Sequence, residues 1–169
     1  MNVCRIKSYA KINLALNVTG KLTLLHKIES IVSFIDLHDL ILIKKTNKKN
    51  HQISFYGKFS KNISSNNTVR KLFIILEEKK LLKDKKFQIK IKKNIPQKAG
   101  LGGGSMNAAS ILNFLIKKKF INISQKKIKY ISNLIGSDVI LGLNSSNIIL
   151  SSNNIIKIFS TSPKFHSLL

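Results

Sequence analysis

A glycine-rich stretch at residues 97–109, QKAGLGGGSMNAA, constrains the fold of this chain more than any other feature. Gly100, Gly102, Gly103 and Gly104 are half of the 8 glycines in the 169 residues. The segment before them alternates apolar and polar residues as a strand does, and the segment after them repeats apolar residues at helical spacing. Glycine permits positive φ and close approach, and a helix start presents unpaired N–H groups. The stretch therefore predicts a phosphate-binding loop.

Two better-known phosphate motifs do not fit this loop. No Gly-Lys-Ser/Thr follows it, which excludes a P-loop. The dinucleotide fingerprint is excluded because Gly100-x-Gly102-x-x is followed by Ser105 and the surrounding βαβ pattern is missing. Ser105, at the helix start, can offer its hydroxyl to a phosphate or to a metal ion. A flexible turn or a tight helix–strand contact is the alternative use of these glycines.

Alternating patterns predict several strands. In the first of them, Ile12, Leu14, Leu16 and Val18 share one face, which predicts a half-buried strand with this apolar face turned inward. A turn near residues 38–39 is expected to separate the second strand from the third. The expected strands are AKINLALNV, ESIVSFIDL, DLILIKK, HQISFYGKF and FQIKIKK, with a closing hairpin in NIILSSNNIIKIFS.

Helical spacing and capping residues predict helices between these strands. The first follows SSNN, with apolar positions continuing as far as Leu81. The second begins near Ser105 and carries lysines in its last turn, and the third is bounded by Ser124 and Gly136. Strands that interleave with helices in this way predict an α+β domain.

The charge balance favours anionic partners, since 30 Lys and Arg face 7 Asp and Glu, for a formal net charge of +23. The lysines are scattered from Lys44 to Lys129, and Asn and Ile are also abundant, so we interpret the charge as compositional and expect no specific nucleic-acid partner. The single cysteine, Cys4, excludes an internal disulfide and a cysteine-based zinc site. No apolar run has the length of a signal peptide core or a membrane span, so we expect a cytoplasmic protein without a membrane partner.

The glycine loop and its neighbours resemble the GHMP kinase superfamily. PQKAGLGGGS, from Pro96 to Ser105, resembles its phosphate loop, Pro-x-x-x-Gly-Leu-Gly-Gly-Gly-Ser. AKINLALNVTGK, HKIESIVSFIDLHDLI and LIGSDVILGL resemble, in order, three motifs of the 4-diphosphocytidyl-2-C-methyl-D-erythritol kinase family. The match runs from Ala10 to about Gly142, and its combination of motifs is more specific than the loop alone.

The resemblance implies the amino-terminal domain of a GHMP kinase, a fold shared with a ribosomal protein domain, over residues 1–160. Residues 161–169 would be a short tail where the second domain of the family begins. We therefore expect this chain to represent an amino-terminal half. The core surface that a second domain would cover favours self-association or pairing with a separate carboxy-terminal chain.

The resemblance also implies an activity. This is the ATP-dependent phosphorylation of the 2-hydroxyl of a diphosphocytidyl polyol, 4-diphosphocytidyl-2-C-methyl-D-erythritol, in the non-mevalonate isoprenoid pathway, with ATP and Mg²⁺. It assigns the catalytic base to Asp138 and its cationic partner to Lys11. A carboxylate can take the proton of the acceptor hydroxyl, and a neighbouring cation offsets the charge that builds on the transferred phosphoryl group.

The remaining implied site residues divide between nucleotide, metal and acceptor. Asn13 would lie near the acceptor, the main chain of His26 would read the cytosine, and Ser105 would contact Mg²⁺. The nucleotide would be bound by Pro96, Gly100, Leu101, Gly102, Gly103, Gly104, Ser105 and Asn66.

This sequence departs from the family pattern at two positions and leaves other functions open. Leu25 stands where an aromatic residue would stack on cytosine, and it offers apolar contact without stacking. Ile140 replaces the proline that follows Asp-Val in the family. The alternatives are another GHMP kinase, such as a homoserine or mevalonate kinase, a basic nucleic-acid-binding module, and a non-catalytic truncated remnant.

Overall fold

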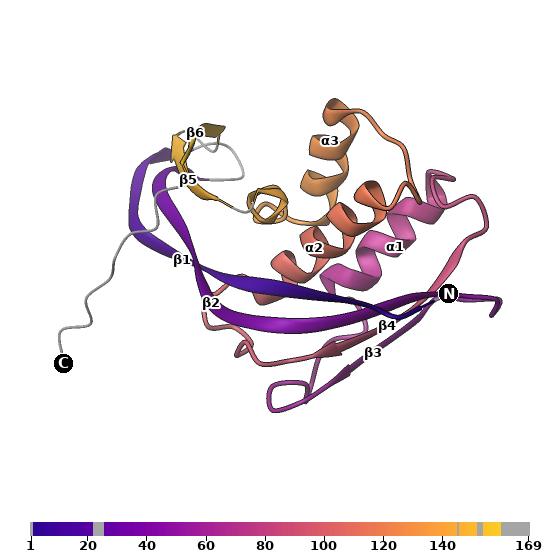
Figure 1. The fold of residues 1–169 in the computed structure, drawn as a ribbon. Coiled ribbons are helices and arrows are strands. Elements are labelled where there is room, and N and C mark those ends of the chain that lie inside the picture. Colours follow the sequence, from indigo (N-terminus) through magenta and orange to yellow (C-terminus); the bar gives the residue numbers. More distant parts are fainter. Residues whose placement is uncertain (1, 22–25, 145, 152–153, 160–169) are drawn as a thin grey trace. The chain divides into compact units, whose positions relative to one another are not determined.

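The computed structural model describes residues 2–21, 26–144, 146–151 and 154–159 and divides into two compact units (Figure 1). The first unit combines residues 1–11 with 35–143, and the second combines residues 12–34 with 144–169. Strands β1 (Cys4–Lys21) and β2 (His26–Thr46) contribute residues to both units. A single domain over residues 1–160 stays a prediction, and the expected tail lies outside the described residues.

The sheet of the first unit is built around β4 (Lys86–Lys92), which lies between β2 and β3 (Gln52–Tyr56). The β2–β4 pair is antiparallel from Leu40 opposite Lys92 onward, and the β3–β4 pair is parallel. Strand β1 pairs with the other side of β2. Alternation along β2 and β4 buries one face of the sheet in its centre, with Ile41, Phe87, Ile89 and Ile91 at 0% exposure.

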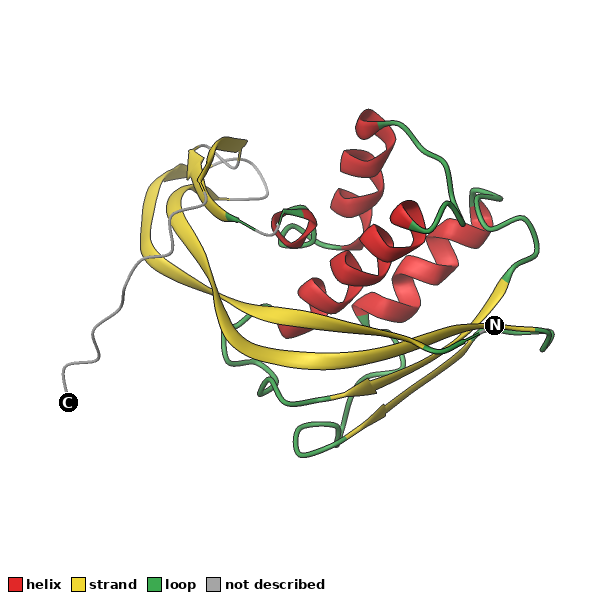
Figure 2. Cartoon of the chain, viewed as in Figure 1, coloured by secondary structure: helices red, strands yellow, loops and turns green. Residues whose placement is uncertain are grey.

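Helices α1 (Thr68–Glu78) and α2 (Gly103–Lys117) cover that buried face of the sheet (Figure 2), and α3 (Gln125–Ile135) packs against α1. The 3₁₀ turn η1 (Leu141–Leu143) follows α3. The expected caps are confirmed: Ser124 accepts a hydrogen bond from Lys127 N–H, and α3 ends at Gly136. No helix among the described residues is both long and apolar enough to cross a bilayer.

The imidazole of His51 is buried among aromatic rings just before β3. Its ring centroid lies 4.5 Å from that of Phe73, and its plane is tilted by only 7° from the Phe87 ring. Nδ1 accepts a hydrogen bond from the Phe87 N–H at 3.0 Å, so in the neutral ring Nε2 carries the proton, 3.1 Å from Glu77 Oε1. Burial lowers the pKa of His51, and the hydrogen bond from Lys86 lowers the pKa of Glu77.

The second unit is an antiparallel arrangement of strands. Strand β5 (Asn147–Ser151) pairs with the first half of β2 and with β6 (Asn154–Phe159), which confirms the predicted closing hairpin. Ser33 Oγ donates a buried hydrogen bond to Asn147 Oδ1 at 2.8 Å and so ties β2 to β5. The interleaved strands and helices of the chain confirm the α+β class.

The expected turn near residues 38–39 is wrong, because β2 runs without a break from His26 to Thr46. Asp39, a residue typical of turns, is fully buried here and accepts hydrogen bonds from the backbone that follows β4. Its polarity therefore marks an internal hydrogen-bonding site instead of a chain reversal.

The half-buried face expected for β1 is also wrong in part. Leu14, Leu16 and Val18 share one face but are 43%, 55% and 64% exposed. The alternation reports which face of the strand is apolar and carries no information on what covers it. In α1 the helical pattern ends early: the helix stops at Glu78, and Leu81 contacts the core from the following turn.

Candidate functional site

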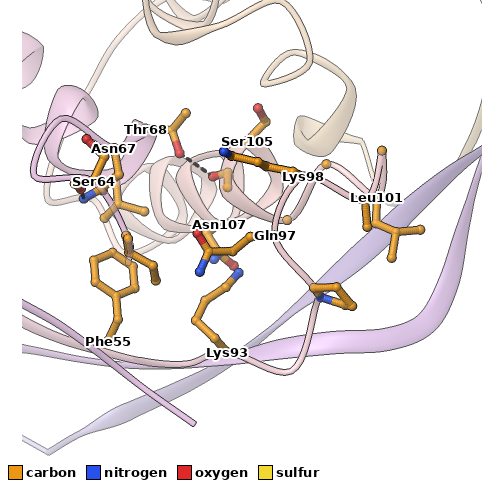
Figure 3. Close-up of a pocket in the computed structure, with 18 of the residues that line it drawn as sticks. Phe55, Ser64, Asn67, Thr68, Lys93, Gln97, Lys98, Leu101, Ser105 and Asn107 are labelled. Carbon is orange, nitrogen blue, oxygen red and sulfur yellow. Dashed lines mark hydrogen bonds between the residues drawn. The ribbon is translucent and has the colours of Figure 1, made fainter. Parts of the chain in front are cut away.

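The glycine-rich loop forms one wall of a cavity of about 430 Å³ in the first unit (Figure 3). The loop residues from Pro96 to Ser105 face the start of α1, where Asn66 and Asn67 lie. Phe55 of β3 and Lys93, just after β4, also line the cavity. The cavity thus lies where β3 and β4 end and where α1 and α2 begin.

The backbone of the loop is folded to present N–H groups. Lys98, Gly100 and Gly102 all have positive φ, at 57°, 73° and 67°. Gly102 is the N-cap of α2, and no side chain caps the helix. The first-turn N–H groups of α2 and the positive end of its dipole therefore face the cavity as a site suited to an anion.

Close contacts explain why the start of α2 consists of glycines. A Cβ atom on Gly103 would lie 3.0 Å from Ile95 Cγ2, and one on Gly104 would lie 3.1 Å from Thr68 Oγ1. The Thr68 hydroxyl donates to the Gly104 carbonyl at 2.7 Å. Because Thr68 is the first residue of α1, this bond ties the starts of α1 and α2 together beside the cavity.

Lys11 and Asp138 form an ion pair next to the loop, with Lys11 Nζ 3.5 Å from Asp138 Oδ2. The lysine side chain is 11% exposed and the aspartate side chain 39%. The N–H of Lys11 donates to the Leu101 carbonyl at 3.1 Å. A Cβ atom on Gly102 would come within 2.9 Å of Lys11 Cγ. Strand β1, the loop and the turn after α3 therefore meet at one place, with a carboxylate open to solvent.

Ser105 lines the cavity in the first turn of α2. Among the described residues, no group of three or more His, Cys, Asp and Glu side chains could hold a metal ion.

The other residues predicted from the sequence lie in different places. Asn66 is an exposed residue at the cavity, and its N–H donates to Ser64 Oγ at 3.0 Å. Asn13 belongs to the second unit, where its amide donates to Ser30 Oγ at 2.8 Å. His26 is the first residue of β2, also in the second unit. Leu25, expected near the cytosine, lies outside the described residues.

Sequence reasoning missed a set of polar residues behind the loop. Lys93 and Asn107 both line the cavity although they are only 4% and 1% exposed, and both contact the buried Asp39. Thr68, which also lines the cavity, was not predicted as a site residue either. The available signal was position: Lys93 precedes the loop, and Asn107 interrupts a run of small and apolar residues one turn into α2.

The chain matches known protein families over this site. The profile of the GHMP kinases N terminal domain matches residues 67–152. The 4-diphosphocytidyl-2-C-methyl-D-erythritol kinase of Pelagibacter ubique (strain HTCC1062) is 63% identical over 169 residues, which are all of this chain and 60% of that protein. The enzyme of the same name from Clostridium perfringens (strain 13 / Type A) is 38% identical over 136 residues, 80% of this chain and 46% of that protein.

Solved structures show the same fold. A crystal structure of 4-(cytidine 5'-diphospho)-2C-methyl-D-erythritol kinase superposes with a TM-score of 0.71 at 22% identity and covers 92% of this chain and 55% of that one. Mevalonate kinase from methicillin-resistant Staphylococcus aureus MRSA252 gives a TM-score of 0.63 at 12% identity, over 96% of this chain and 57% of that one. This chain thus spans 60% or less of the length of these relatives.

Proposed function

Because the chain belongs to the GHMP kinases, we propose that it is the nucleotide-binding part of a 4-diphosphocytidyl-2-C-methyl-D-erythritol kinase acting in the cytoplasm. The reaction transfers the γ-phosphoryl group of ATP to the 2-hydroxyl of the diphosphocytidyl polyol and releases ADP. The 63% identity to the Pelagibacter ubique enzyme over the whole chain supports this substrate more than it supports any other GHMP kinase substrate.

One observation carries the catalytic assignment: the Lys11–Asp138 pair lies beside an uncapped, glycine-built helix start. We assign Asp138 to accept the proton of the acceptor hydroxyl, because its carboxylate is partly open to solvent. Lys11 would offset the negative charge on the transferred phosphoryl group. The backbone from Gly100 to Ser105 would hold the ATP phosphates, and Asn66 would lie beside the adenine.

Magnesium, when bound with the nucleotide, neutralises charge on the β- and γ-phosphate oxygens. In this chain the Ser105 hydroxyl is the group that we propose holds the ion.

The acceptor side of the proposal rests on the second unit. Asn13 would contact the acceptor, and the main chain of His26 would read the cytosine. The amide of Asn13 makes a hydrogen bond with Ser30, which orients its side chain before any substrate is present. Misplacing an acceptor by about an ångström costs about a hundredfold in rate. We therefore expect the turnover rate to depend strongly on the groups that hold the acceptor in place.

A coupled ADP-release assay on the 169-residue chain tests the proposal. We expect saturable MgATP binding and slow turnover of the diphosphocytidyl substrate, with a faster rate when the remaining segment of the Pelagibacter ubique relative is added as a second chain. Asp138→Asn should lower that rate by about 10²–10⁴. Asp84→Asn, a change at an exposed aspartate outside the site, is the matched control.

Two results would contradict the proposal. A chain that fails to bind MgATP would not be the nucleotide-binding part of a kinase. A rate that Asp138→Asn leaves equal to the Asp84→Asn control would remove Asp138 from catalysis.

A further inference from the structure

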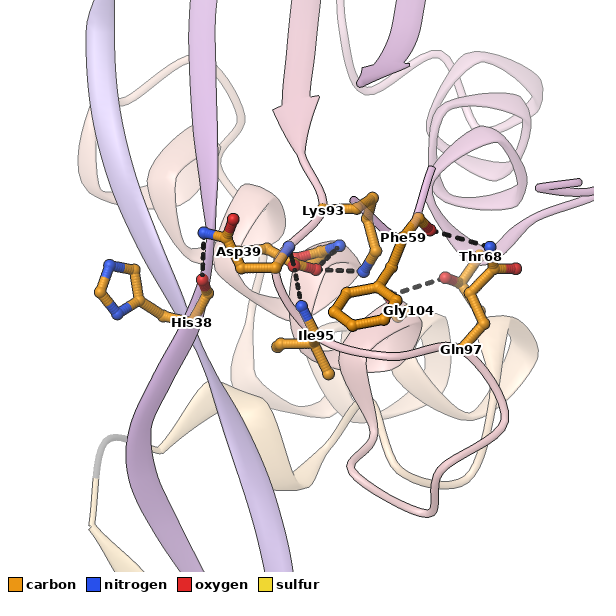
Figure 4. Close-up of polar contacts among 10 residues, drawn as sticks. His38, Asp39, Phe59, Thr68, Lys93, Ile95, Gln97 and Gly104 are labelled. Carbon is orange, nitrogen blue, oxygen red and sulfur yellow. Dashed lines mark hydrogen bonds and ion pairs between the residues drawn. The ribbon is translucent and has the colours of Figure 1, made fainter. Parts of the chain in front are cut away.

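Asp39 is a carboxylate buried completely inside the first unit, with 0% exposure. A charge removed from water is tolerated only when partners replace the lost hydration. Both carboxylate oxygens are used here (Figure 4). Oδ1 accepts the N–H groups of Asn94 and Ile95 at 2.8 and 2.9 Å, and Oδ2 accepts from Asn107 Nδ2 at 2.8 Å and is paired with Lys93 Nζ.

These partners lie on both sides of the glycine-rich loop. Asn94 and Ile95 immediately precede Pro96, where the loop begins. Asn107 lies one turn into α2, the helix that the loop opens. A single carboxylate therefore fixes the chain before the loop and the helix after it, so the backbone between them has both ends held.

The ammonium group of Lys93 lies directly against the loop. A Cβ atom on Gly103 would be 3.3 Å from Lys93 Nζ, and the lysine is 4% exposed. Lys93 also lines the cavity, together with Asn107. Asp39 itself does not line the cavity, but two of its partners, Lys93 and Asn107, form part of the surface of the anion site.

We propose that Asp39 is a positioning residue for nucleotide binding: through Lys93, Asn107 and the N–H groups of residues 94 and 95, it holds the glycine-rich loop in its phosphate-binding shape. The inference rests on the proposed function in taking the phosphates of a nucleotide as the loop's ligand. A buried ion pair is commonly no more stabilising than apolar residues of the same volume. Stability alone is therefore a weak reason for a carboxylate at this position.

Two variants separate positioning from general stability. Asn107→Ala removes the bond between Asp39 and α2 but leaves the charge pair and the backbone bonds in place. The double variant Asp39→Asn with Lys93→Met removes both charges together, so that no unpaired ammonium stays buried. The control is Leu115→Ala, a fully buried residue of the same helix, about 18 Å along the axis from Gly103.

Amide hydrogen exchange of the loop, measured without ligand, is the first readout, and the dissociation constant for MgATP is the second. We expect Asn107→Ala to speed exchange at residues 100–105 by about tenfold and to weaken MgATP by a similar factor, with larger effects for the double variant. Leu115→Ala should lower the melting temperature at least as much as Asn107→Ala while changing both readouts less than about twofold.

The proposal is overturned if Asn107→Ala leaves loop exchange at the wild-type rate, or if Leu115→Ala speeds it equally. In either case the order of the loop would follow global stability. Exchange is measured without nucleotide, so it decides the role of Asp39 even for a chain that does not bind MgATP. Absent binding by the wild-type chain would count against the proposed function instead.

Discussion

The residues behind the glycine-rich loop in the first unit and the apolar residues of β1 in the second unit differ in which side chains are buried. Behind the loop, the Asp39 carboxylate is 0% exposed and fully hydrogen-bonded. On β1, Leu16 and Val18 are 55% and 64% exposed. A charged group lies inside one unit while apolar groups face water in the other. Whether a side chain is buried here therefore depends more on the partners available to it than on its residue type.

The two units also differ in which side of the proposed reaction, nucleotide or acceptor, their residues are assigned to. The groups assigned to the nucleotide and the proposed catalytic pair, Lys11 and Asp138, all lie within the first unit, and the two charged groups of the pair are 3.5 Å apart. The groups assigned to the acceptor, Asn13 and His26, lie in the second unit. Nucleotide binding is therefore the activity that we expect to depend least on anything added to this chain.

The largest expected effect concerns stability. Leu112→Ala removes a fully buried side chain from the first unit and should cost about 2–5 kcal/mol of unfolding free energy. Leu16→Ala, at a position that is 55% exposed, should stay within about 0.5 kcal/mol. Urea denaturation of both variants measures the contrast. A Leu16→Ala cost near that of Leu112→Ala, growing with protein concentration, would show that self-association covers β1 in solution.

The next effect concerns the loop. Gly102→Ala combines a positive φ with a Cβ atom 2.9 Å from Lys11 Cγ, and we expect MgATP to bind about ten- to a hundredfold more weakly. Gly100→Ala is the matched variant, since Gly100 also has a positive φ but its Cβ atom would meet nothing within 4 Å. Titration with a fluorescent ATP analogue compares them. Equal losses in both variants would show that backbone strain, and not contact with Lys11, controls the site.

A smaller effect is a loss of stability in acid. The folded-state pKa of His51 lies below its unfolded value because of burial, so its contribution is present above that unfolded value and is lost as pH falls through the folded pKa. The lowered pKa of Glu77 acts in the same direction at lower pH. We expect thermal stability to decline from about pH 6.5 downward. His51→Gln should flatten the upper part of that decline, and an unchanged profile would assign it to other groups.

The smallest effect concerns nucleic acid. We expect weak RNA binding that collapses with salt, because we interpret the net charge of +23 as general and not as a nucleic-acid site. Lys90→Ala with Lys92→Ala on β4, and Lys126→Ala with Lys127→Ala on α3, remove equal charge from exposed positions. Both pairs should weaken binding to the same degree in filter-binding assays. A much larger loss from one pair, or binding that survives moderate salt, would define a dedicated face.

The sequence predicted those parts of the fold that local chemistry determines. The caps of α3, the alternation that buries Phe87 and Ile89, and the closing hairpin follow from patterns within a few residues. The glycine-rich loop was visible for the same reason. The juxtaposition of Lys11 with Asp138 came from a family resemblance, because no local rule joins two residues so far apart in the chain.

The rest depended on contacts that only the folded chain creates. Asp39 resembled a turn residue because its partners, Asn94, Ile95 and Asn107, come more than fifty positions later. The exposure of Leu14 could not be predicted, because alternation shows which face of a strand is apolar but not whether other residues pack against that face. Propensity describes the effect of neighbours in the sequence, whereas the burial of Asp39 and the exposure of Leu14 depend on neighbours in space.

The bond from Lys11 N–H to the Leu101 carbonyl, together with the Lys11–Asp138 pair, also has a consequence for biosynthesis. The first of these residues leaves the ribosome long before the last. At about 5–20 residues per second, on the order of ten seconds separates Lys11 from Asp138. Until Leu101 has been made, β1 has neither the loop nor its acidic partner to contact. The nascent chain therefore contains the apolar strand β1 well before it contains the loop residues that this strand contacts in the folded state.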